Sequence, residues 1–254
     1  MNDIIISVND ITKKYGSFTA VNGISFNVKR GEIFGILGPN GAGKTSLLEM
    51  MEGLRSITAG DALIDGLSVK HSVNKVKRII GIQLQSTGFF EELNLIELLN
   101  LYAGLYDVKI NPMELLHEVE LEDKAKSQVR KLSGGQQQRF AICLSLANTP
   151  KVIFLDEPTT GLDPQARRHV WGIIKNIREK GMTIIFTTHY MEEAENLCDR
   201  VMIMDHGDVI KTGKPVELIE NLISSGFKKE QPVLSANLED VFISLTGHNI
   251  REDI

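Results

Sequence analysis

Apolar runs and helical segments alternate along most of the chain. Segments rich in Ile, Val and Phe at residues 4–8, 18–28 and 32–37 predict β-strands. Polar and apolar residues alternate in the second segment, which favours an antiparallel strand with one exposed face. Residues 152–155 and 183–186 are almost wholly apolar, as expected for parallel strands covered on both faces. The pattern predicts an α/β protein with a mostly parallel sheet and an N-terminal antiparallel β-subdomain.

Turn residues and helical periodicity place further elements. The pairs Asp65-Gly66 and His206-Gly207 each separate two short apolar segments, so both predict hairpin turns. Residues 134–147 predict a helix, and residues 164–181 predict an amphipathic helix that ends at Gly181.

A helical block interrupts this alternation of strands and helices. The pattern turns helical over residues 91–128, where Asn111-Pro112 is a suitable cap and first-turn pair. We therefore expect a helical subdomain, at about residues 91–140, inserted into a domain that spans residues 1–222. Residues 223–254 are a predicted C-terminal extension, in which a linker-like segment precedes one more short helix or a strand and a helix.

Composition and charge narrow the class of protein. The chain has 254 residues, of which 42% are hydrophobic and 24% charged, as in ordinary globular proteins. Its net charge of -5 argues against a nucleic-acid partner, which usually requires a basic surface. Cys143 and Cys198 have no metal-like spacing, and we expect both to be small buried groups in a reducing compartment.

We expect neither a signal peptide nor a membrane-spanning helix. The N-terminus lacks a basic segment followed by a long apolar run. A membrane helix needs roughly 20 mostly apolar residues. The best candidate, residues 93–106, is interrupted by Asn94, Glu97 and Asn100.

A glycine-rich loop lies between the apolar strand at residues 32–37 and a predicted helix. It matches the pattern G-x-x-x-x-G-K-[ST] completely. Glycines allow several backbone N–H groups to point at phosphate oxygens, and the helix adds the positive end of its dipole. Lys44 can reach the β- and γ-phosphates, and the Thr45 hydroxyl can hold Mg²⁺. The loop predicts a P-loop NTPase core, and its candidate nucleotide-binding residues are Gly38, Pro39, Asn40, Gly41, Ala42, Gly43, Lys44, Thr45 and the following Ser46.

Two carboxylates follow the apolar run at residues 152–155. The run brings Asp156 to the carboxyl end of a strand, where ligands bind in open α/β sheets. A carboxylate there can hold magnesium through its water shell. Glu157 is the better candidate for polarising an attacking water.

Two further residues have a functional and a structural interpretation. His189 ends the strand predicted at residues 182–189 and can reach a γ-phosphate or the attacking water, although a lone histidine at a strand end is usually structural. Tyr15 can stack on adenine, or it can equally be a packing residue.

A second candidate anion site opens the helix predicted at residues 134–147. Ser133 is a natural N-cap, and the glycines after it expose backbone N–H groups at a positive helix end. The chain has a single P-loop, so one nucleotide can use both sites if the second comes from another molecule. The residues of this second site are Ser133, Gly134, Gly135 and Gln136.

The sequence LSGGQ, followed by VIFLDEPTTGLD, resembles the ATP-binding cassette (ABC) family, and the resemblance extends over nearly the whole chain. It implies an ABC nucleotide-binding domain that hydrolyses ATP with Mg²⁺. By resemblance, Tyr15 is the adenine-stacking residue, and residues 38–45 are the Walker A loop. Residues 133–136 are the signature that completes the nucleotide site of the opposite subunit.

The resemblance also implies roles for the acidic and strand-end residues. Asp156 corresponds to the Walker B aspartate, Glu157 to the general base and His189 to the switch histidine. Asp163 lies in the loop that links the two sites. In IGIQLQ the glutamine that touches magnesium and senses the membrane partner is Gln83 or Gln85, and we favour Gln85 because Gln83 falls inside the predicted strand.

Several longer segments resemble the ATPases of bacterial multidrug and antibiotic exporters. This likeness implies a homodimer at the cytoplasmic face of the membrane, where it powers export of a drug, antibiotic or lipid-like cargo through a separate integral-membrane permease. The alternatives are a soluble ABC ATPase that acts on ribosomes or DNA, and a non-hydrolysing regulatory module. A small-molecule kinase shares the P-loop but has no use for the signature helix.

Overall fold

A computed structural model describes residues 3–83, 88–90 and 92–227. The chain divides into two compact units, Met1–Glu217 and Leu218–Ile254. The first unit contains two sheets and the candidate site. The helix α8 (Pro215–Ser224) begins at the end of the first unit. Among the described residues, every helix is too short or too polar to cross a membrane.

Four strands from residues 4–68 form an antiparallel sheet, in the order β2-β1-β4-β5. Tyr15 pairs with Phe18 across the turn that joins the first two strands. Asp65 and Gly66 both have positive φ, 48° and 78°, and they join the last two strands in the predicted hairpin turn. The strands are β1 (Ile4–Tyr15), β2 (Phe18–Lys29), β4 (Ala59–Ile64) and β5 (Leu67–Ser68).

The second sheet has six strands in the order β10-β9-β3-β8-β7-β6. All the strands from β9 to β6 in this order run parallel to one another. Only β10 is antiparallel, and the predicted turn at His206-Gly207 joins it to β9. This confirms the predicted α/β fold with a mostly parallel sheet. The strands are β3 (Ile33–Leu37), β6 (Ile80–Gln83), β7 (Val152–Asp156), β8 (Thr183–Thr188), β9 (Arg200–Asp205) and β10 (Asp208–Gly213).

Helix α1 (Lys44–Met51) lies in the core that the two sheets share. Its Leu47, Met50 and Met51 are fully buried in one cluster with residues of both sheets. Further helices beside the second sheet include α2 (Val69–Ile79), α6 (Pro164–Glu179) and α7 (Met191–Leu197). Cover on both faces of the sheet explains why β3, β7 and β8 are buried at every position.

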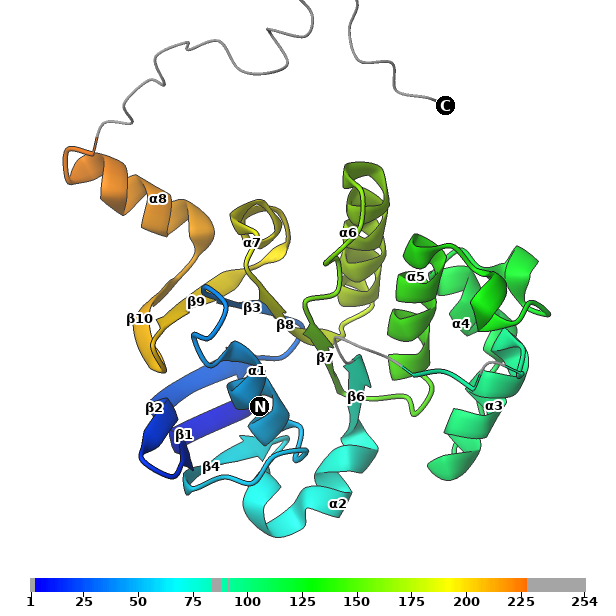
Figure 1. The fold of residues 1–254 in the computed structure, drawn as a ribbon, viewed down its shortest axis with the longest axis horizontal. Coiled ribbons are helices and arrows are strands. Elements are labelled where there is room, and N and C mark those ends of the chain that lie inside the picture. The colour runs from blue at the N-terminus through cyan, green and yellow to red at the C-terminus, as the bar shows by residue number, and fades with distance from the viewer. Residues whose placement is uncertain (1–2, 84–87, 91, 228–254) are drawn as a thin grey trace, which may run out of the picture. The chain divides into compact units, whose positions relative to one another are not determined.

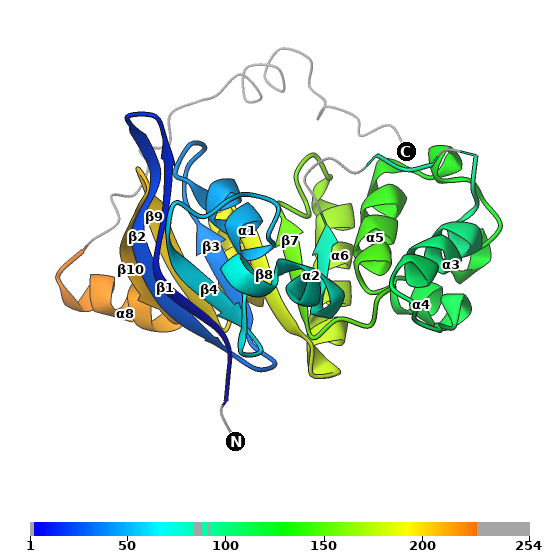
Figure 2. The ribbon, with the colours of Figure 1, turned by 90° about the horizontal axis from the view of Figure 1, so that it is seen from below.

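The predicted helical block is present beside the edge strand β6, on the other side of the parallel sheet from β1 and β2 (Figures 1 and 2). Asn111 caps α4, with Pro112 in the first turn as predicted, and Asn94 and Glu97 form a capping box on α3. The elements are α3 (Leu95–Leu105), α4 (Pro112–Glu118), two short 3₁₀ turns (Glu122–Lys124 and Val129–Lys131) and α5 (Gly134–Ser145).

The two cysteines are buried and unbridged, as the sequence predicted. Burial raises the pKa of both the Cys143 and the Cys198 thiols. The helix or strand predicted within residues 233–247 lies outside the described residues.

Candidate active site

The glycine-rich loop joins β3 to α1, as predicted, and its backbone requires glycine. Gly41 and Gly43 have φ of 84° and 98°, values that residues with a side chain rarely adopt. A Cβ on Gly38 would lie 2.3 Å from the Met204 carbonyl oxygen, and one on Gly43 would lie 2.4 Å from the Ala20 carbonyl oxygen. The loop therefore curls tightly against the ends of β2 and β9 before α1 begins.

Lys44 is buried at the start of α1 and points back into the loop. Its Nζ donates to the carbonyl oxygens of Gly38 (2.9 Å) and Pro39 (3.2 Å). The same ammonium lies 3.5 Å from Glu157 Oε1. A cation is thus held at the mouth of the loop, where the sequence predicted a phosphate-binding lysine.

Asp156 ends β7 beside Thr187 of β8, its partner in the parallel pairing. The Thr187 hydroxyl donates to Asp156 Oδ1, and the Thr45 hydroxyl donates to Asp156 Oδ2 over 3.2 Å. Burial raises the pKa of the Asp156 carboxyl above its ordinary value. A carboxylate that is costly to bury and lies next to a second carboxylate is a suitable place for a divalent cation.

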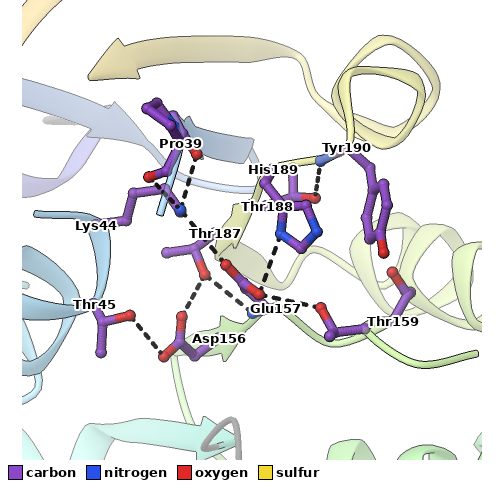
Figure 3. A network of polar contacts seen from close by, with 12 residues as sticks. Pro39, Lys44, Thr45, Asp156, Glu157, Thr159, Thr187, Thr188, His189 and Tyr190 are labelled. Atoms are coloured by element: carbon purple, nitrogen blue, oxygen red, sulfur yellow. Dashed lines mark hydrogen bonds and ion pairs between the residues drawn. The ribbon is translucent and has the colours of Figure 1, made fainter. Parts of the chain in front are cut away.

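Glu157 follows with a left-handed backbone, φ 47°, and its N–H donates to Thr187 Oγ1 over 3.0 Å. The side chain is nearly buried, and one of its oxygens accepts from the Thr160 hydroxyl over 3.1 Å. His189 Nδ1 lies 3.3 Å from Glu157 Oε2. Figure 3 shows Lys44, the consecutive residues Asp156 and Glu157, and His189 converging from three separate segments of the chain.

Lys44, Glu157 and His189 border a cavity of about 690 Å³, within the range of small-molecule sites. Tyr15 stands at its rim with 42% of its surface exposed. The Tyr15 ring and the Glu157–His189 pair both border this one cavity, so a base and a triphosphate can be bound together. The lining residues are Tyr15, Phe18, Ala20, Asn40, Gly41, Gly43, Lys44, Thr45, Ser46, Glu157, Thr160 and His189.

The donor set fits ATP with Mg²⁺. Fixed backbone glycines and one ammonium suit phosphate oxygens, and a hydroxyl with a neighbouring carboxylate suits a hard cation. Thr45 and Asp156, whose side-chain oxygens lie 3.2 Å apart, would hold the cation.

Other predicted residues lie away from this cavity. Ser133 caps α5 and accepts from the Gln136 N–H over 3.3 Å. Asp163 caps α6 and accepts from the N–H groups of Gln165 and Ala166. Within the described part of the chain, the cavity lining includes neither of these helix ends.

The predicted sensing glutamine cannot be placed. Gln83 is the last residue of β6 and is 2% exposed, so it does lie inside the strand, as the sequence argument assumed. The preferred Gln85 lies outside the described residues.

Two residues of the site were not predicted. Thr187 contacts both candidate acidic residues, and only the strand pairing reveals it. Glu193 of α7 is 1% exposed and accepts from the hydroxyls of Thr159 and Thr188 and from Trp171 Nε1 at 3.3 Å. It thus connects the segment after Glu157 to the end of β8, and its burial raises its pKa.

Comparison with known proteins agrees with this geometry. Residues 21–160 match the family model described as ABC transporter. The chain is 40% identical to the Nod factor export ATP-binding protein I of Ralstonia nicotianae, over 86% of this chain and 70% of the relative. It is 39% identical to the linearmycin resistance ATP-binding protein LnrL of Bacillus subtilis, over 86% of this chain and 72% of that protein.

The chain also shares its fold with a solved structure. That structure is a dimeric ATP-binding cassette in a post-hydrolysis state, bound to ADP and Pi. The match has a TM-score of 0.74 and 28% identity, and it covers 83% of this chain and 98% of the cassette. From the loop geometry, the converging acidic residues and these relatives together, we conclude that the chain belongs to the ABC transporter family and is an ATP-binding, ATP-hydrolysing subunit.

Proposed function

We propose that two copies of this chain bind two ATP molecules between them and power export through a separate membrane permease. Each ATP contacts the glycine-rich loop of one copy and the Ser133–Gln136 helix end of the other. The chain acts at the cytoplasmic face of the membrane, and its cargo is a drug, an antibiotic or a lipid-like molecule. The names of the relatives, one a Nod factor exporter and one a linearmycin resistance protein, support the direction of transport.

One observation carries the dimer proposal: the two anion-binding elements of the chain do not share a cavity. The loop at residues 38–45 borders the cavity, whereas Ser133 and Gly134 are exposed at the start of α5. A Cβ on Gly134 would meet no atom within 4 Å among the described residues, so its backbone has room for a phosphate. The similar cassette structure is a dimer, as this arrangement requires.

Within the site, each residue has a distinct task. Lys44 binds the β- and γ-phosphates. Glu157, fixed between Lys44, Thr160 and His189, takes the proton of an attacking water. His189 orients Glu157 and the γ-phosphate side of the site. Thr45 and Asp156 would hold Mg²⁺, with Gln85 as a further predicted ligand, and the cation would supply positive charge to the phosphate oxygens.

Separation of the two copies follows hydrolysis, because the γ-phosphate is the link between the loop and the partner's Ser133 helix. Asp163, at the start of α6, lies in the segment that joins the two sites. The helical block then moves with α5 and transmits the change to the permease. This is a two-state element ordered by a ligand.

Glu157→Gln tests the assignment of the base. Glutamine keeps the size of the side chain but cannot take a proton, so ATP binding should persist while hydrolysis falls by at least about 100-fold. With ATP and Mg²⁺, size-exclusion chromatography should show a stable dimer. Glu192→Gln, an exposed neighbour on α7, is the matched control and should hydrolyse ATP normally. Normal turnover by Glu157→Gln would show that another group is the base.

A further inference from the structure

The side chain of Arg55 reaches the base-binding end of the site without bordering the cavity. Arg55 lies in the turn after α1, forty residues from Tyr15 in the sequence but in contact with it. Its Nη1 donates to the Tyr15 hydroxyl, and its guanidinium carbon lies 5.5 Å from the ring centroid. The cavity lining includes Tyr15 but not Arg55. Any effect of Arg55 on a nucleotide base therefore passes through the tyrosine.

Arg55 is itself fixed to α1. Its Nε donates to the Glu49 carboxylate, and its backbone N–H donates to the Glu49 carbonyl oxygen over 3.0 Å. The first of these bonds raises the pKa of the guanidinium. Both the side chain and the backbone of Arg55 are thus bonded to Glu49, near the C-terminal end of α1.

A second cation lies beside the same ring. Lys13 is only 7% exposed, and its Nζ donates to the carbonyl oxygen of Ser56 (2.7 Å) and to its hydroxyl (2.9 Å). The Nζ lies 5.1 Å from the Tyr15 centroid, within the range of a cation–π contact. Two cations therefore lie beside an aromatic ring that is 42% exposed: Arg55, held by Glu49 of α1, and Lys13, held by Ser56.

An exposed side chain that binds a ligand must be ordered, which costs conformational entropy when the side chain is free beforehand. A hydrogen bond from a charged donor reduces this cost because the side chain is already in place. We propose that Arg55 is a positioning residue that orients Tyr15 for the adenine base and ties it to the helix whose first residues bind the phosphates. The inference rests on the proposed base contact of Tyr15.

Helix α1 then sets the distance between the two ends of the nucleotide. Lys44 and Thr45 begin the helix at the phosphate end, and Glu49 near its other end holds Arg55 and, through it, Tyr15. A ligand with a base gains from this link, and a ligand made only of phosphates does not. A comparison of affinities for these two classes of ligand therefore distinguishes positioning of the Tyr15 ring from simple attraction between Arg55 and the negative charge of the phosphates.

The test compares the affinity of the full chain for ATP and for inorganic tripolyphosphate, both with Mg²⁺, by calorimetry. Arg55→Gln should weaken ATP binding by about fivefold and leave tripolyphosphate binding unchanged. Tyr15→Phe keeps the ring but removes the oxygen that accepts from Arg55, so it should lose ATP affinity by a similar factor. In a Tyr15→Ala background, Arg55→Gln should have no further effect on either ligand.

Lys14→Gln is the charge control, because it removes an exposed cation next to Tyr15 in the sequence; it should leave both affinities unchanged. Equal losses for ATP and tripolyphosphate in Arg55→Gln would overturn the positioning role and show a charge effect. An undiminished loss in the Tyr15→Ala background would also overturn it. If Tyr15→Ala leaves ATP affinity intact, the base contact is wrong and the positioning role falls with it, while ATP binding by the loop stands. Failure of the native chain to bind ATP would refute the proposed function itself.

Discussion

At the scale of single residues, Thr187 carries two contacts that a hydrophobic isostere would remove. Its hydroxyl donates to Asp156 and accepts from the Glu157 N–H. Thr187 is also completely buried, so the loss of the hydroxyl leaves a buried N–H and a buried carboxylate oxygen without this partner. Thr187 therefore fixes the Asp156 carboxylate and the Glu157 backbone, although it does not line the cavity.

We predict that Thr187→Val lowers the kcat for ATP hydrolysis by about 10- to 100-fold, because it disturbs groups whose geometry matters most in the transition state. The KM for ATP should change much less, since Lys44 bonds to Gly38 and Pro39 and pairs with Glu157, and Thr187 does not line the cavity. Steady-state ATPase kinetics measure both constants. Thr187→Ser keeps the hydroxyl and should retain most of the kcat. If the serine variant is as slow as the valine variant, the hydroxyl is not the cause.

At the scale of elements, Glu52, the C-cap residue of α1, carries a buried carboxyl group. It is 1% exposed, and neither carboxyl oxygen has a hydrogen-bond partner among the described residues. Burial, with the nearby negative charges of Asp156 and Glu49, raises its pKa from 4.5 to about 8. Between these two values the folded chain holds a proton that the unfolded chain has released.

The contribution of Glu52 to the free energy of unfolding should therefore be greatest below about pH 4.5, and it should fall as the pH rises towards 8. We predict that Glu52→Gln flattens this dependence, so that from pH 5 to pH 8 it loses about 3 kcal/mol less unfolding free energy than the native chain. Urea unfolding without nucleotide or Mg²⁺ measures the difference. Glu217→Gln, at an exposed ion pair with Lys214, is the control and should leave the slope unchanged. Parallel slopes for Glu52→Gln and the native chain would contradict the prediction.

The elements that the sequence predicted are those with a local signal. The turns at Asp65 and His206 need positive φ, and a following glycine marks both. Ser133 and Asn111 are side chains that cap the helices they precede. Helix α2, in contrast, was not predicted: only Val69 and Val76 are buried in it, so its apolar stripe is too sparse to detect.

The contacts that the sequence did not predict join distant segments. Thr187 reads as an ordinary strand residue until the pairing of β7 with β8 places it beside Asp156. Arg55 reads as a solvated loop residue until the turn after α1 brings it to Tyr15. The position of each candidate site residue along a strand or loop was therefore predictable, but the supporting residues depend on register and on tertiary packing.

At the scale of the whole molecule, the proposed site is divided between two copies, and this makes a prediction about mixtures. Lys44→Ala removes the phosphate-binding cation from the loop, and Ser133→Arg fills the exposed start of α5. In a homodimer of either variant, each of the two ATP sites contains one defect, so neither variant alone should hydrolyse ATP. In a heterodimer, one site collects both defects, and the other combines a native loop with a native α5.

An equal mixture of the two variants should therefore recover about a quarter of the native ATPase activity, because half of the dimers are mixed and each has one intact site of two. Coupled-enzyme assays at a total concentration that favours the dimer measure this recovery. The control is a chain that carries both substitutions, mixed in equal amount with the native chain. Its mixed dimers have one site with a defect in the loop and the other with a defect in α5, so they contribute nothing, and the native homodimers account for all activity. If the two single variants together stay inactive, although each still folds and dimerises, then the loop and the Ser133 helix end do not act on the same ATP from opposite copies.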